Sequence, residues 1–231
     1  IPFEYETITN IGNYELTTYI STVTSDGQSQ LIGWGKGNFA DGTSNHITPK
    51  HISLAATGVE GENTDIPGDL STFGIVINDG QNDHIFTAGN NEFGELGVGD
   101  TEDRSVFTEV LPNQELASNS VDLSLELDFA GSALIDNQLY TWGNNHGQRL
   151  GLSSGSIILV PTKVETSSTE GTITQLSTGS DNILFLTDDG INQRMYYVNQ
   201  TEMYLTIIQS ANPEITSDGV IVNNVTSSSA T

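Results

Sequence analysis

The side chains best suited to chemistry in this sequence are carboxylates that gather in one short stretch. Glu60, Glu62 and Asp65 lie close together, and Asp69 follows them. Ca²⁺ takes about six to eight oxygen ligands from flexible loops, which neighbouring carboxylates and amides can supply. The spacing differs from that of the helix–loop–helix calcium motif, whose loop ends in glutamate. The stretch is therefore a candidate calcium site, and the sequence predicts no other cofactor.

A second stretch with oxygen-bearing side chains runs from Asn78 to Asp83. It contains the pair Asp79-Gly80, which is typical of a tight hairpin turn because both residues tolerate a positive φ angle. The turn alone accounts for these residues, and calcium ligation is the alternative.

The sequence lacks the residue patterns of known catalytic sites. The only histidines are His46, His51, His84 and His146, and none stands in a metal or catalytic-triad motif. No nucleophile elbow, phosphate loop or dinucleotide fingerprint is present. Because the chain has no cysteine, it can form neither a disulfide nor a thiolate metal site. These observations predict a protein that is not an enzyme.

A short phrase that ends in glycine recurs along the chain. Its copies read Leu-Ile-Gly-Trp-Gly, Ile-Phe-Thr-Ala-Gly and Leu-Tyr-Thr-Trp-Gly, and they close at Gly35, Gly89 and Gly143, so both intervals are 54 residues. A tandem unit of this length cannot bury its apolar face alone. The spacing therefore predicts stacked or ring-arranged repeats.

Each copy of the phrase follows a turn signal. These signals are Asp26-Gly27, Asp79-Gly80 and Asp136-Asn137, and a fourth copy begins at Asp189-Gly190. The runs before the turns are apolar or β-branched, which is the pattern of a β-hairpin. Repeated about four times, this pattern predicts an all-β chain.

Trp34 and Trp142 occupy the same place in two copies of the phrase. A large ring beside a glycine is suited to packing between neighbouring sheets, so we expect both rings to anchor the core. The alternative is an aromatic platform for a sugar.

The residues that follow the phrase resemble those of a known repeat family. The second copy continues with Asn-Asn and Gly-Glu-Leu-Gly, and the third with Asn-Asn, Gly-Gln-Arg-Leu-Gly and Pro-Thr-Lys-Val. This order resembles the regulator of chromosome condensation repeat, a family of β-propellers with one four-stranded sheet per blade. The resemblance is good over 84–190, fair over 25–80 and poor elsewhere. It implies about four antiparallel blades, in a small closed or a partial propeller, whereas the family typically closes with seven.

The copies also depart from the family pattern. Ala88 stands where the family usually has Trp, Phe107 stands where it usually has Pro, and the third copy carries an inserted residue next to Leu150. The resemblance therefore implies the fold more strongly than any activity. Some relatives exchange guanine nucleotides on small GTPases, but the loops that do so find no match here.

The sequence divides into a strand extension (1–24), a repeat domain (25–198) and a C-terminal strand with a Ser/Thr-rich tail (199–231). Exposed sheet edges of a partial propeller must be covered or paired. The flanking strands can complete the chain's own sheets, or they can be donated to a neighbouring chain.

The charge composition limits the kinds of partner that the chain can bind. Thirty acidic residues against six basic ones give a net charge of −24, which repels nucleic acid and anionic lipid and attracts a basic protein.

No segment reaches the roughly 20 apolar residues of a membrane span. The chain is rich in Ser, Thr and Asn and poor in Lys, which favours an extracellular or cell-surface location. Asn199 and Asn224 begin glycosylation acceptor sequences.

These inferences lead to two expectations of function. The first is a non-catalytic secreted or cell-surface structural or adhesive module, which could self-associate through sheet edges into a fibre by strand exchange. The alternative is a soluble propeller scaffold that binds a protein partner.

Overall fold

The computed structural model describes the strands and the loops around the central repeats. The described residues are 7–14, 17–23, 29–36, 45–52, 54, 57, 62–65, 72–112, 114–117, 120–126, 130–153, 155–166, 171–179, 183–191, 193–198, 207–210, 214–216, 219–221 and 226–228. Within them the regular structure is β-strand apart from one 3₁₀ turn, η1 (His146–Gln148). The predicted all-β class is confirmed. No helix among these residues has the length and apolar character needed to cross a membrane.

The described strands form four main antiparallel sheets that follow one another along the chain. The first contains β1 (Thr7–Tyr14), β2 (Thr17–Val23), β3 (Ser29–Lys36) and β4 (Asn45–Ile52). The second contains β5 (Glu62–Asp65), β6 (Thr72–Asn78), β7 (Asn82–Gly89) and β8 (Arg104–Val110), with β9 (Leu116–Ala117) beside β7. The third contains β10 (Val121–Glu126), β11 (Ala130–Ile135), β12 (Gln138–Asn144) and β13 (Ile157–Lys163). The fourth contains β14 (Thr172–Thr178), β15 (Ile183–Asp188), β16 (Gln193–Val198), β17 (Ile207–Ser210) and β20 (Thr226–Ser228). A separate two-stranded sheet is formed by β18 (Glu214–Thr216) and β19 (Gly219–Ile221).

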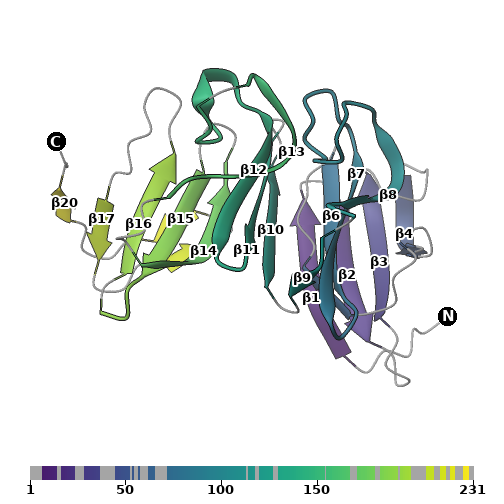
Figure 1. Cartoon of the computed structure of the whole chain (residues 1–231). Helices are drawn as coiled ribbons and strands as arrows, with labels where there is room; N and C mark the ends of the chain where they lie inside the picture. The colour runs from purple at the N-terminus through teal and green to yellow at the C-terminus, as the bar shows by residue number, and fades with distance from the viewer. Residues whose placement is uncertain are drawn as a thin grey trace.

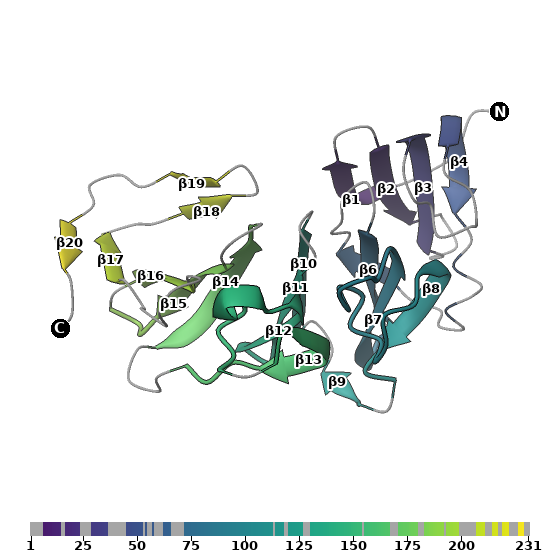
Figure 2. The ribbon, with the colours of Figure 1, turned by 90° about the horizontal axis from the view of Figure 1, so that it is seen from above.

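The sheets are arranged as the blades of a propeller-like arc. Figure 1 shows the first and fourth sheets at opposite ends of this arc, and Figure 2 shows the same order from above. In Figure 2, β1, β10 and β14 lie on the inner side, and β4, β8 and β13 lie on the outer side. Strands β1 and β2 pair with each other and with β3, so the N-terminal flank completes a sheet of its own chain.

The recurring glycine phrase has a local structural cause. Gly35, Gly89 and Gly143 have φ angles of 114°, 123° and 97°. At each of them the pairing of the phrase strand with the outer strand shifts its register. A bulge with positive φ favours glycine, because a side chain is strained in that conformation. The repeat therefore preserves a bend at the same point of three blades.

The predicted hairpin turns connect the two central strands of the blades. Gly80 and Gly190 have φ angles of 92° and 83°, and Asp136 and Asn137 have φ angles of 50° and 59°. These values confirm the turn prediction at three positions. Asp26-Gly27 lies outside the described residues.

Three apolar layers separate successive sheets. The first layer joins the first and second sheets, and its largest members are Tyr19 and Phe73, whose rings stack 4.1 Å apart. The second layer contains Trp142 of the third sheet and Ile85 of the second. The third layer contains Phe185 and Tyr196 of the fourth sheet. Each sheet thus buries a face against the next, as stacked repeats require.

A cross-strand exchange of large and small residues explains why the second copy lacks its Trp. In the third sheet, Gly131 lies opposite Trp142, and the indole ring covers the glycine. In the second sheet, Phe73 lies opposite Ala88, so the large ring comes from the other strand. Phe107 then packs against Phe73 at 5.3 Å. Total volume is conserved across each pair, which well-packed layers tolerate.

Candidate functional site

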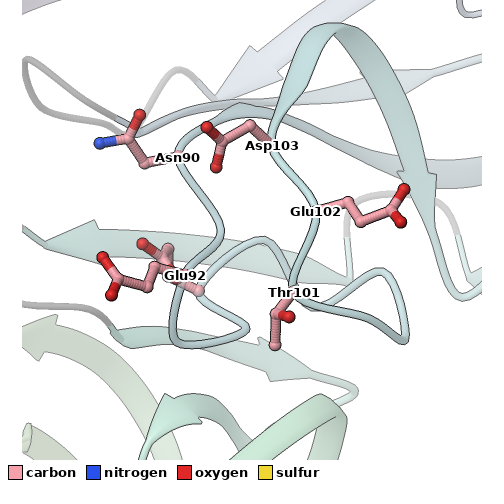
Figure 3. Close-up of a pocket in the computed structure, with 6 residues that line it drawn as sticks. Asn90, Glu92, Thr101, Glu102 and Asp103 are labelled. Carbon is pink, nitrogen blue, oxygen red and sulfur yellow. The ribbon is translucent and has the colours of Figure 1, made fainter.

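The loop from Asn90 to Asp103, between β7 and β8, forms an open hollow of about 570 Å³ (Figure 3). The hollow is lined by Asn90, Glu92, Glu95, Thr101, Glu102 and Asp103. Four of these six side chains carry carboxylates. In Figure 3 Asn90 and Asp103 lie close to each other across the hollow, while Glu102 points away from them. The loop therefore presents acidic side chains in more than one direction.

Asn91 holds this loop in one shape. Its side chain is fully buried, and its Nδ2 donates to the carbonyl oxygens of Asp100 at 2.9 Å and Glu102 at 3.1 Å. Its Oδ1 accepts from the backbone nitrogen of Leu96 at 3.0 Å. Because one buried amide satisfies three backbone groups, the loop is ordered before any partner binds.

Asn145 holds the corresponding loop of the third sheet through the same kind of hydrogen bonds. Asn145 Nδ2 donates to the carbonyl oxygens of Leu152 at 3.0 Å and Gly155 at 2.9 Å, and its Oδ1 accepts from Leu150 at 3.1 Å. The Asn-Asn dipeptide of the sequence repeat is thus a loop-holding element.

Glu95 lines the hollow and is 3% exposed. Burial raises the pKa of its carboxyl above the usual value, and the charges of Asp103 and Glu92 raise it further. Backbone hydrogen bonds act in the opposite direction, and one of them is the 2.8 Å bond that the carboxylate accepts from the nitrogen of Phe93. The net direction is upward, so this carboxyl binds a proton more readily than an exposed one.

Arg104 neutralises one carboxylate at the edge of the loop. Its Nη2 lies 2.6 Å from Asp100 Oδ2, and this hydrogen bond is the main reason why the pKa of Asp100 is lowered. Glu92, Glu102 and Asp103 are exposed and carry the acidic character of the loop surface.

The loop also depends on the neighbouring blade. The indole nitrogen of Trp142 donates to the carbonyl oxygen of Glu95 at 2.8 Å. Gly97 faces the same ring, and a Cβ there would lie 2.9 Å from the indole. The Trp142 side chain is fully buried, so it packs between sheets and does not form a surface platform. Trp34 is partly buried.

His84 forms an arrangement that its sequence position does not suggest. Its Nδ1 lies 3.0 Å from Glu109 Oε1, and its Nε2 lies 3.3 Å from Asp79 Oδ2. Burial lowers the pKa of His84, but the hydrogen bonds to Glu109 and Asp79 outweigh this effect, and the pKa is raised. The sequence places His84 in no metal or catalytic-triad motif. The signal was hidden because Glu109 is distant in the sequence.

The stretch Asn78–Asp83 is the hairpin turn that the sequence predicts. Asp79 Oδ1 accepts from the backbone nitrogens of Gln81 and Asn82, at 2.8 and 2.7 Å. Asp83 is 2% exposed, and its Oδ2 accepts from the nitrogens of Ser120 at 2.8 Å and Val121 at 3.1 Å. These carboxylates accept hydrogen bonds from the backbone of the turn and of the segment before β10.

The predicted calcium and glycan sites remain predictions. Glu60, Asp69, Asn199 and Asn224 lie outside the described residues, and Glu62 and Asp65 belong to β5 without a described side-chain position. Elsewhere in the described part of the chain, no three His, Asp or Glu side chains gather as a metal site requires.

Comparisons with known proteins identify the repeat. The pattern of the family "Regulator of chromosome condensation (RCC1) repeat" matches residues 136–186, from the β11–β12 turn to β15. Human E3 ubiquitin-protein ligase HERC2 is 25% identical over 177 residues, which are 75% of this chain and 4% of that protein. The mouse X-linked retinitis pigmentosa GTPase regulator is 31% identical over 80 residues, which are 35% of this chain and 8% of that protein. Residues 136–186 thus match an RCC1 repeat, and the chain is similar to RCC1-repeat proteins.

The fold of this chain has a counterpart among solved structures. Yeast RCC1 (Prp20), in its complex with Kap60, aligns with a TM-score of 0.60 and 14% identity. The alignment covers 86% of this chain and 45% of that one. The four-sheet arc thus corresponds to somewhat less than half of the yeast protein, and it spans a small fraction of the curated relatives.

Proposed function

We propose that this RCC1-repeat chain is a non-catalytic module that binds a protein partner through the acidic loop Asn90–Asp103. The partner would present a segment rich in Lys or Arg. The observation that carries this proposal is the pre-ordered loop, in which buried Asn91 fixes the backbone while exposed carboxylates surround the hollow. A site that is ordered before binding loses less entropy on association.

The relatives support a binding role. Yeast RCC1 was solved bound to Kap60, and the mouse relative is named a GTPase regulator. Both observations concern those proteins, and they favour the scaffold expectation over the structural-fibre expectation for this chain. A location outside the cell remains a prediction from composition.

Electrostatics support a basic partner. The chain carries a net charge of −24, which attracts cationic segments at long range. Exposed Glu92, Glu102 and Asp103 add local charge at the loop. Charge complementarity of this kind mainly raises the association rate and the specificity of binding.

The decisive experiment compares two double variants with equal charge. Glu92→Gln with Glu102→Gln changes the loop, whereas Glu115→Gln with Glu165→Gln changes exposed glutamates elsewhere. Binding of a lysine-rich peptide is measured by fluorescence anisotropy, with a glutamate-rich peptide as the negative probe. The loop variant should weaken binding about tenfold, equivalent to ~1.4 kcal/mol, and the control should bind like the parent.

Equal weakening by both double variants would mean that net charge alone attracts the peptide. That result would remove the loop as a docking site. Absence of peptide binding by the parent at moderate salt would contradict the basic partner itself.

A further inference from the structure

The outer strand of the third sheet carries exposed apolar side chains next to the acidic loop. They are Ile157, Leu159 and Val160 of β13, which we call the apolar strip. Ile157 and Val160 are 40% and 47% exposed, and Leu159 is partly buried. Large apolar side chains that gather at one exposed place are typical of an interaction surface.

The equivalent strand of the second sheet shows that the fold does not require this strip. Positions 103–106 precede 157–160 by 54 residues, which is the interval of the repeat, and they read Asp-Arg-Ser-Val in place of Ile-Ile-Leu-Val. The two strands pair alike, because Gly89 lies opposite Arg104 and Gly143 lies opposite Ile158. An outer strand of this fold therefore accepts polar residues where the third sheet has apolar ones.

The acidic loop touches the apolar strip through its backbone. The nitrogen of Gly99 donates to the carbonyl oxygen of Leu159 at 2.9 Å. A Cβ at Gly94 would lie 3.0 Å from Leu159 Cδ2 and 3.3 Å from Ile157 Cγ2. A Cβ at Gly99 would lie 3.9 Å from Val160 Cγ1. The acidic loop and the apolar strip thus form one continuous surface.

Exposed carboxylates lie within a short distance of the apolar strip. Glu92 comes two residues before Gly94, and Glu102 comes three residues after Gly99. Three residues span at most about 11 Å. An extended peptide rises ~3.3 Å per residue, so one bound segment can reach both a carboxylate and the apolar strip within about four residues.

The outer edge of β13 limits how a partner can bind there. Pro161 has no N–H to offer to another strand. The carbonyl oxygen of Leu159 accepts from the acidic loop, and that of Val160 accepts from Thr162 Oγ1 at 3.0 Å. An edge strand with these features resists the addition of a further strand. A partner is therefore expected to contact β13 through side chains.

We propose that the acidic loop and the apolar strip together bind an extended segment with one large apolar side chain beside its Lys or Arg residues. This inference rests on the proposed function and adds a hydrophobic anchor to it. The carboxylates of Glu92 and Glu102 select a cationic segment. The apolar strip removes the surface of the anchor from water. The anchor distinguishes this segment from one that net charge alone attracts.

Two labelled peptides of equal charge test the anchor. Both contain a run of lysines, and one carries Leu where the other carries Ser, close to the run. In fluorescence anisotropy with the parent protein, the Leu peptide should bind about tenfold more tightly than the Ser peptide. Added salt should weaken both and leave their ratio near tenfold, because salt screens charges and not apolar contacts.

Substitutions in the apolar strip should remove the preference for Leu. Ile157→Thr with Val160→Thr should bring the two peptides to about equal affinity and leave binding of the Ser peptide unchanged. Thr is β-branched and suits a strand, and Val160→Thr alone is the milder variant if the double variant folds poorly. Val106→Thr is the matched control, since Val106 is 45% exposed at the equivalent position of β8, and it should keep the tenfold ratio.

The possible failures point to different causes. Equal binding of the two peptides to the parent would overturn the anchor and leave the basic-segment function intact. A ratio lost in Val106→Thr but kept in the strip variants would place the anchor on the second sheet, and would also overturn the proposal. Absence of binding by both peptides would contradict the proposed function together with the anchor.

Discussion

Trp142 of the third blade donates its indole N–H to the carbonyl oxygen of Glu95, in the loop of the second blade, at 2.8 Å. A repeat residue thus fixes the acidic loop of the preceding repeat. The shape of the acidic surface is therefore coupled to packing between blades.

The first prediction concerns this coupling. Trp142→Ala should lower the free energy of unfolding by about 3–5 kcal/mol, because the ring is fully buried and leaves a cavity. Trp142→Phe keeps most of the volume but leaves the Glu95 carbonyl without its donor, and should cost about 1–3 kcal/mol. Denaturant titration measures both losses. A melting temperature unchanged by Trp142→Ala would contradict the buried position of the ring.

The second prediction concerns the exchange of large and small residues between blades. Ala88→Trp should destabilise the second sheet by about 1–3 kcal/mol, because Phe73 already fills the space opposite. Adding Phe73→Gly reproduces the pairing of Gly131 with Trp142 and should restore part of the loss. A double-mutant cycle measures the coupling. Strictly additive effects would show that the two positions do not compensate each other.

The third prediction concerns the buried carboxyl of Glu95. Its pKa is raised by burial, so the folded state disfavours the charged form. The protein should gain stability from this group as pH falls toward the folded pKa and below it. Glu95→Gln should therefore stabilise the protein at about pH 7, and the gain should shrink near pH 4. Thermal unfolding at both pH values checks this, with Glu92→Gln as the exposed control.

The fourth prediction concerns His84. Its pKa is raised by Glu109 and Asp79, so its stabilising contribution is complete below about pH 6.5 and is lost as pH rises through the folded pKa. His84→Gln should lower the melting temperature more at about pH 6 than at about pH 9. His146→Gln, at an exposed position, is the control. An equal loss at both pH values would mean that the two carboxylates hold the ring without regard to its charge.

The features that depend on local backbone geometry could be predicted from the sequence. The positive φ angles at Gly80, Asp136 and Asn137 belong to residues that tolerate them, so the turns were visible as dipeptides. The bulges at Gly35, Gly89 and Gly143 explain the fixed spacing, and the all-β class follows from both. A local conformational requirement restricts the residue type at one position, which a single sequence can display.

The features that depend on contacts between distant residues could be recognised only in the folded structure. Whether Phe73 or Trp142 fills the layer between blades depends on the residue opposite, which sequence spacing does not reveal. The carboxylates around His84 come from both sides of its strand, and Glu109 is 25 residues away. The proximity of Ile11, Ile20 and Ile32 became visible only when the strand register was known. Packing is decided by volume and burial across strands, and these are properties of the folded chain rather than of any single segment.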